Sequence, residues 1–125
     1  MPYEIKVAGS FAAAHALRGY GGACERLHGH NFKVTAAARA RELNAVGIAL
    51  DFKEFSSYLG DVLELLDHQN LNELPPFRER NATAENIAAY IFGQLAPRLE
   101  QTGAKLNRVT VEESEKYAAS FGPDV

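Results

Sequence analysis

The sequence has few of the features that direct a protein to membranes or to an oxidising compartment. Cys24 is the only cysteine among 125 residues, so no disulfide can form within the chain. A single thiol beside several histidines is typical of an intracellular protein. No segment approaches about 18 consecutive apolar residues, and residues 1–6 lack the basic and apolar stretches of a signal peptide. We therefore expect a cytoplasmic protein with no membrane partner.

The sequence also lacks an excess of basic residues. It contains 13 Lys and Arg against 16 Asp and Glu, for a net charge of −3. Because proteins bind phosphate backbones through basic faces, nucleic acid is not expected as the main partner. The length predicts one domain that spans residues 1–125.

Apolar periodicity predicts two strands followed by two helices. Alternation that begins at Tyr3 indicates a strand to about residue 15, and a second strand is expected over about 28–41. Asp51 has the form of a helix N-cap before a helix over about 52–65. After a loop over 67–82, Thr83 is expected to cap a second helix that ends near Leu99.

Two further strands are expected near residues 106–111 and 117–121, so the order is strand, strand, helix, helix, strand, strand. This grouping predicts an α+β fold with a four-stranded antiparallel sheet and two helices packed on one face. The uncovered face or an exposed edge of such a sheet needs a partner, which predicts a homo-oligomer.

Three of the four histidines form a pattern that can bind a metal. His28 and His30 are two residues apart, so in a strand they point to the same face and could share one ion. His15, near the end of the preceding strand, could supply a third ligand. Three histidines with an open fourth position are typical of a catalytic zinc site. Ordinary surface or hydrogen-bonded histidines remain an equal alternative at this point.

Other residues near these histidines could take part in chemistry. Cys24 lies four residues before His28, where a nearby cation would favour its thiolate, although a small buried side chain is the alternative. Asp67 and His68 could form an acid–base pair or be loop polar residues. One of Glu112 and Glu113 is expected to point inward, where paired N–H donors of a ligand would satisfy it.

Together these segments resemble the 6-pyruvoyltetrahydropterin synthase / 6-carboxytetrahydropterin synthase family. The resemblance extends in order over nearly the whole chain. The matching stretches are Phe11-Ala12-Ala13-Ala14-His15, Cys24-Glu25-Arg26-Leu27-His28-Gly29-His30-Asn31, Leu50-Asp51-Phe52, Leu66-Asp67-His68-Gln69-Asn70-Leu71-Asn72, Thr83-Ala84-Glu85-Asn86 and Glu113.

The resemblance implies the tunnelling fold, in which subunits join their sheets into a barrel, commonly as trimers that pair into hexamers with active sites at the interfaces. It also implies a Zn²⁺ cofactor and a pterin triphosphate substrate, 7,8-dihydroneopterin triphosphate. The implied roles are metal binding for His15, His28 and His30, acid–base catalysis for Cys24, Asp67 and His68, and pterin binding for Glu113, with Thr83 and Glu85 near the same pocket.

The product is expected to be 6-carboxy-5,6,7,8-tetrahydropterin, on the route to queuosine. Alternatives are 6-pyruvoyltetrahydropterin, the tetrahydrobiopterin precursor, and 6-hydroxymethyl-7,8-dihydropterin for folate. Glu25, directly after Cys24, motivates a dual activity that includes the last product, because some relatives lack the cysteine and use a glutamate three residues before the first histidine of the pair for that cleavage. The alternative for Glu25 is an acidic loop residue without a catalytic role. Two rivals from other classes are a non-catalytic pterin-binding protein and a three-histidine iron oxygenase.

Overall fold

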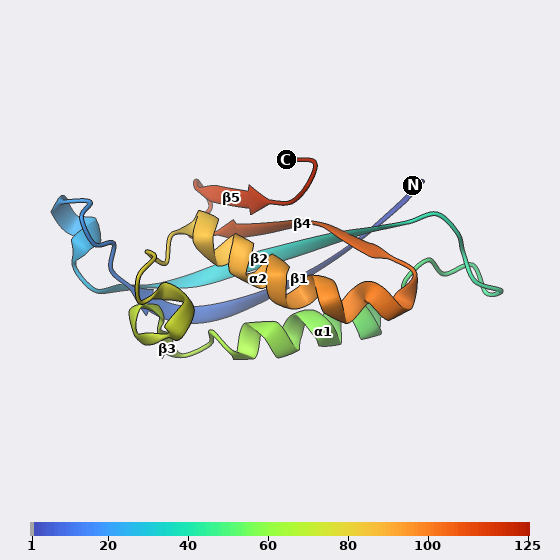
Figure 1. Cartoon of the computed structure of the whole chain (residues 1–125), viewed down its shortest axis with the longest axis horizontal. Helices are drawn as coiled ribbons and strands as arrows, with labels where there is room; N and C mark the ends of the chain where they lie inside the picture. The colour runs from blue at the N-terminus through green and yellow to red at the C-terminus, as the bar shows by residue number, and fades with distance from the viewer. Residues whose placement is uncertain (1) are drawn as a thin grey trace.

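The computed structural model describes residues 2–125, apart from the side chain of Cys24, and shows a five-stranded sheet with two helices against one face (Figure 1). The strands lie in the order β3-β1-β2-β4-β5. Their bounds are β1 Tyr3–His15, β2 His28–Ala40, β3 Gln69–Asn70, β4 Lys105–Glu112 and β5 Ala118–Phe121, and the helices are α1 Phe52–Glu64 and α2 Ala84–Leu99.

The two longest strands, β1 and β2, form an antiparallel pair that sets the register of the whole sheet. Tyr3 lies opposite Ala40 at one end, and His15 lies opposite His28 at the other. His30 consequently lies opposite Ala13 on the same pair. Because side chains alternate along a strand, His15, His28 and His30 all point to one face. This confirms the predicted shared face of the histidines.

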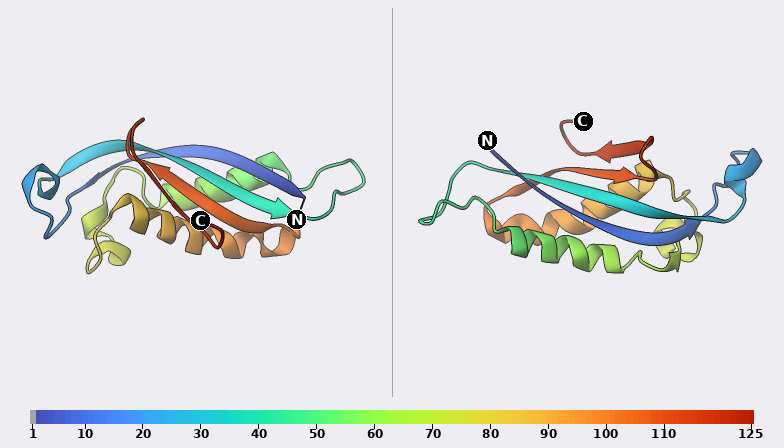
Figure 2. Two further views of the ribbon diagram at one scale, coloured as in Figure 1. Left: turned by 90° about the horizontal axis from the view of Figure 1, so that it is seen from above. Right: turned by 180° about the vertical axis from the view of Figure 1, so that it is seen from behind.

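The helices begin at the predicted caps and cover the apolar face of the sheet. The Asp51 carboxylate accepts the backbone N–H groups of Lys53 and Glu54, and the Thr83 hydroxyl accepts that of Asn86. Both helices lie on the same side of the sheet in Figure 2. Their buried stripes, which include Phe55 and Leu59 of α1 and Ile87 and Ile91 of α2, share one core with the sheet. The sheet contributes alternate residues, including Phe11, Phe32, Val34 and Val109. Neither helix of the described chain is long and apolar enough to cross a membrane.

The prediction of four strands, all antiparallel, was wrong in one respect. Within the predicted loop 67–82, Gln69 and Asn70 form β3, which pairs in parallel with Ala13 and Ala14 of β1. The element order therefore becomes ββαβαββ. A two-residue strand is too short to show a period-2 pattern, so the sequence carries no signal for it. Its effect is to attach the segment after α1 to the end of β1, beside His15.

Candidate metal centre

Three histidines and one glutamate meet at the end of the sheet where β1 ends and β2 begins. One candidate ligand atom from each of His15, His28, His30 and Glu113 lies within 4.8 Å of the other three. Glu113 directly follows the last residue of β4, so two strands and the turn after a third supply the group. Imidazole nitrogens and a carboxylate oxygen are ligands that zinc uses in proteins. The group could therefore hold a metal ion.

The ring of His15 has one satisfied nitrogen and one unsatisfied nitrogen. Its Nδ1 lies 2.7 Å from the carbonyl oxygen of Ala82, so Nδ1 carries the proton that this carbonyl accepts. Its Nε2 is buried and has no hydrogen-bond partner among the described residues. Buried polar atoms without partners are rare in native proteins and point to a missing water or ion. A metal bound at Nε2 would satisfy this atom, so the four residues fit a metal ion.

His28 and His30 lie beside His15 on the same face of the sheet, next to the apolar ring of Phe32. Nδ1 of His28 lies 2.7 Å from the carbonyl oxygen of Arg26, which leaves Nε2 available to a metal. The ring centroids of His15 and His28 are 4.5 Å apart, and those of His28 and His30 are 5.0 Å apart. Phe32 is fully buried and meets both His15 and His30 edge to face. These contacts limit rotation of the rings.

The surroundings of His30 favour its neutral form, which is the form that binds metals. Burial lowers the pKa of His30 below 6.5, and the nearby rings of His15 and His28 act in the same direction. Glu113 opposes this shift because its carboxylate favours a charged imidazole. Burial outweighs the carboxylate, so the net direction is downward.

Two asparagines hold the chain that follows His15. The Asn72 side chain accepts the N–H of Ala16 at 2.9 Å and donates to the carbonyl of Ala16 at 2.8 Å. The Asn81 side chain bonds in the same two ways to the backbone of Arg18, at 3.0 and 2.9 Å. Each amide thus imitates a strand partner for one residue. We call Asn72 and Asn81 the asparagine clamps.

Asp67 and His68 form a hydrogen-bonded pair beside the metal group but outside it. Oδ2 of Asp67 lies 2.8 Å from Nδ1 of His68, and Oδ1 accepts the N–H of Ala12. The pKa of Asp67 is lowered, first by this N–H and then by the His68 ring. The side chain of His68 is 82% exposed, and its φ of 59° lies in the left-handed region. This conformation brings its backbone N–H to the carbonyl of Ala12.

The remaining predicted site residues lie apart from the four-residue group. Glu25 is exposed, and its Oε1 accepts the N–H of Gly19 at 2.9 Å within the loop between β1 and β2. Thr83 caps α2, and Glu85 is exposed in the first turn of that helix. The backbone of Cys24 lies in a single 3-10 turn, Gly22–Glu25, but the prediction for its thiol falls outside the described residues.

Sequence reasoning missed the backbone carbonyls that orient two of the rings. Those of Ala82 and Arg26 accept hydrogen bonds from His15 and His28. A carbonyl is present at every residue, so no residue type signals this role. The clamp role of Asn72 could have been suspected from its place in a polar stretch, but its partner at Ala16 is 56 residues away.

The chain matches known proteins along almost its whole length. Residues 4–124 match the protein family described as 6-pyruvoyl tetrahydropterin synthase. A 6-carboxy-5,6,7,8-tetrahydropterin synthase from Synechocystis sp. is 34% identical, and the match covers 90% of this chain and 87% of that protein. The human 6-pyruvoyl tetrahydrobiopterin synthase is 33% identical over a shorter region, which covers 54% of this chain and 48% of the human protein.

The fold has a solved counterpart. The Caenorhabditis elegans 6-pyruvoyl tetrahydropterin synthase superposes with a TM-score of 0.88 at 26% sequence identity. The superposition covers 97% of this chain and 95% of the nematode chain. The likeness in fold therefore extends over almost the whole chain.

Proposed function

Because this chain belongs to the 6-pyruvoyl tetrahydropterin synthase family, we propose that it is a zinc-dependent lyase that converts 7,8-dihydroneopterin triphosphate to 6-carboxy-5,6,7,8-tetrahydropterin. The observation that carries the proposal is the four-residue group of His15, His28, His30 and Glu113, with an unsatisfied Nε2 at its centre. Three imidazoles leave one coordination position for substrate oxygens. Zinc bound here would polarise those oxygens as a Lewis acid.

The choice of product rests on the extent of the matches. The Synechocystis protein, named for the 6-carboxy product, matches along 90% of this chain. The human protein, named for the 6-pyruvoyl product, matches along 54%. We therefore rank the 6-carboxy product first and 6-pyruvoyltetrahydropterin second.

The chain's own residues supply proton transfer in this proposal. Asp67 holds Nδ1 of His68 at 2.8 Å, so Nε2 of His68 faces outward as a base. The lowered pKa of Asp67 keeps its carboxylate charged, which stabilises the imidazolium that forms when His68 accepts a proton. Cys24 acts as thiolate and removes a proton from the substrate at a different position from His68. Glu113 binds the N–H groups of the pterin ring. Thr83 and Glu85 are proposed to lie near the pocket that takes the ring.

Exposure of the Asp67–His68 pair fits an active site that is completed by a second subunit. The pair lies outside the four-residue group of its own chain. Along residues 3–12, the edge of β1 away from β2 has no strand partner in the described chain. A free edge of this length can pair with a neighbouring subunit. We propose a homo-oligomer, with a hexamer built from two trimers as its form.

Incubation of zinc-loaded protein with 7,8-dihydroneopterin triphosphate tests the reaction. Mass spectrometry should find 6-carboxy-5,6,7,8-tetrahydropterin as the main product. A main product of 6-pyruvoyltetrahydropterin or 6-hydroxymethyl-7,8-dihydropterin would change the assignment. If the hydroxymethyl product forms, the Glu25→Gln variant should remove that product alone. The contact of Glu25 with Gly19 favours a loop role for this carboxylate. The complete absence of a pterin product would reject the lyase.

Cys24→Ala separates the lyase from a non-catalytic pterin-binding protein. We expect turnover to fall by about 10²–10⁴-fold, the usual contribution of a positioned base, while zinc content stays at the wild-type level. Turnover would be measured by product formation and zinc content by atomic absorption. An unchanged rate in Cys24→Ala would remove Cys24 from the mechanism, and iron as the bound metal of active protein would favour the oxygenase.

A further inference from the structure

Glu113 lies closer to the histidine nitrogens than binding of a pterin ring alone requires. Its Oε1 is 3.2 Å from Nε2 of His15 and 3.5 Å from Nε2 of His30. In a tetrahedral site with bonds of about 2.0–2.1 Å, neighbouring ligand atoms are about 3.3 Å apart. Both separations match this edge length. The carboxylate oxygen therefore lies at the spacing of a neighbouring ligand from two of the three histidines, and within 4.8 Å of the ligand atom of His28.

The tautomer of His15 gives the same result by an independent route. Nδ1 donates to the carbonyl of Ala82, so in the neutral ring Nε2 carries a lone pair. This lone pair is buried, makes no hydrogen bond among the described residues, and has the Glu113 oxygen 3.2 Å away. Two acceptors at this distance repel each other unless a proton or a metal ion lies between them, and the geometry of this contact is not that of a hydrogen bond. A metal ion shared by the two atoms removes the repulsion.

The backbone holds Glu113 in this position. Its N–H donates to the carbonyl of Tyr117 at 3.1 Å and closes the turn between β4 and β5. The side chain is 29% exposed, so it can turn about a fixed backbone. Glu112, the preceding residue, ends β4 and does not belong to the four-residue group. The two glutamates carry the same charge, but only Glu113 has a carboxylate oxygen in the four-residue group, so Glu112 is a matched control.

We propose that the Glu113 carboxylate is the fourth metal ligand in the substrate-free protein. It closes the coordination position that the pterin side chain takes, and it leaves that position when substrate binds. The second half of this inference rests on the proposed function. The first half concerns the metal alone, so it can fail or hold whether or not the chain acts on a pterin.

Zinc affinity measured without any pterin tests the assignment. Zinc is titrated against a chromophoric chelator for the wild type, Glu113→Gln, Glu113→Asp and Glu112→Gln. Even residues that only support a ligand change metal affinity by about 10–100-fold, so Glu113→Gln should weaken zinc binding at least about tenfold. Glu112→Gln removes the same charge nearby and should bind zinc like the wild type. Glu113→Asp keeps the charge, and its shorter reach should also weaken binding.

Cobalt supplies a second measurement that does not depend on affinity. Co²⁺ in the wild-type protein should show the intense visible absorption of a four-coordinate site, and Glu113→Gln should change the band position and intensity. Glu112→Gln should keep the wild-type spectrum, and its circular dichroism should match that of Glu113→Gln. Wild-type zinc affinity together with an unchanged cobalt spectrum in Glu113→Gln would overturn the assignment. Equal losses in Glu113→Gln and Glu112→Gln would overturn it too, because charge alone would then explain the effect.

Discussion

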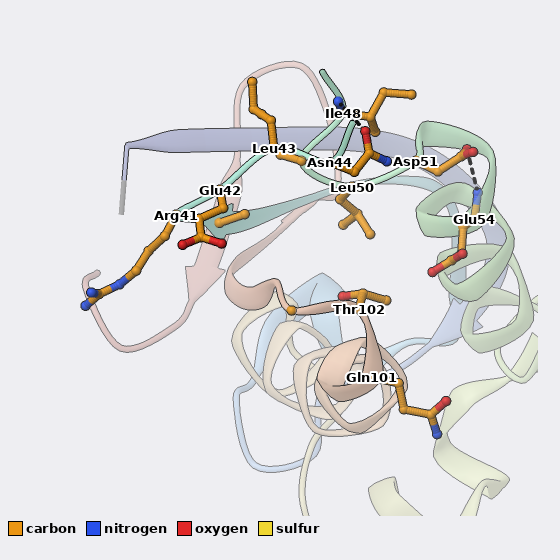
Figure 3. A pocket seen from close by; sticks show the side chains of 13 residues that line it. Arg41, Glu42, Leu43, Asn44, Ile48, Leu50, Asp51, Glu54, Gln101 and Thr102 are labelled. Atoms are coloured by element: carbon orange, nitrogen blue, oxygen red, sulfur yellow. Dashed lines mark hydrogen bonds between the residues drawn. The ribbon is translucent and has the colours of Figure 1, made fainter. Parts of the chain in front are cut away.

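The two ends of the long β1–β2 pair use their polar groups in opposite ways. The end at His15 and His28 carries the four-residue group. The other end, beyond Ala40, opens into a hollow of about 620 Å³ lined by residues 40–44, 48–51, 54 and 101–103 (Figure 3). We call it the loop-end hollow. It is larger than the hollow of about 340 Å³ beside His30.

Polar side chains at the loop-end hollow serve the local backbone. The Asp51 carboxylate accepts two N–H groups at the start of α1. The Asn44 amide oxygen accepts the N–H groups of Val46 and Ile48, and the Thr102 hydroxyl donates to the carbonyl of Leu99. Figure 3 shows the Asp51–Glu54 contact at the rim of the hollow. The caps and turns therefore explain these residues without a ligand.

At the histidine end, by contrast, a buried nitrogen of His15 stays unsatisfied among the described residues. The backbone there serves the side chains: the carbonyls of Ala82 and Arg26 orient two rings. Unsatisfied and convergent polar atoms indicate a functional site better than volume does. Convergent polar atoms, and not the larger volume, therefore mark the candidate metal centre.

Loss of a ligand at the histidine end should have the largest effect. We expect His30→Ala to weaken zinc binding by about 100-fold or more, since even second-shell changes cost about 10–100-fold. Chelator competition measures this affinity. Glu54→Gln, at the rim of the loop-end hollow, is the control and should bind zinc like the wild type. A loss of zinc affinity in Glu54→Gln, or wild-type zinc affinity in His30→Ala, would contradict the distinction between the two ends.

Asparagine offers a finer test, because each end has one that bonds to backbone. Asn72 bonds to both backbone groups of Ala16, one residue after His15, whereas Asn44 accepts two N–H groups of its own loop. Replacement of either by Ala should lower the free energy of unfolding by about 1 kcal/mol, the usual value of such bonds. Only Asn72→Ala should also weaken zinc binding, by about tenfold.

Urea unfolding and chelator competition on both variants measure these effects. An Asn72→Ala protein that loses stability but keeps wild-type zinc affinity would limit this asparagine clamp to a folding role. A loss of zinc affinity in Asn44→Ala would mean that the two ends are coupled through the sheet.

The contrast between the ends also explains what the sequence could predict. The caps at Asp51 and Thr83 and the face shared by His28 and His30 follow from local spacing, and the structure confirms them. The position of His15 opposite His28 needs the register of β1 and β2, which the strand pattern implies only loosely. Contacts between distant segments carry no local signal. This is why β3, the Ala82 carbonyl and the asparagine clamps were not predicted.

The smallest expected effect concerns Asp67 and is a change in how protein stability responds to acid. Asp67 follows α1 at the histidine end, and the Ala12 N–H and the His68 ring hold the pKa of its carboxyl below 3.8. A carboxyl whose pKa is depressed by folding stabilises the protein above its unfolded pKa. This stabilisation is lost as the pH falls through the lower, folded value. Acid should therefore weaken the wild type partly through Asp67.

Asp67→Asn keeps an oxygen that can accept the Ala12 N–H but removes the titration. Its urea midpoint should therefore fall less than that of the wild type between about pH 6 and about pH 3. His68→Ala removes only the second cause of the shift and should give an intermediate response, because the Ala12 N–H remains the larger one. Equal pH dependence in the wild type and Asp67→Asn would show that the Asp67 contact does not persist in solution. The link between α1 and the histidine end would then depend on β3 and the backbone bond from His68 to Ala12 alone.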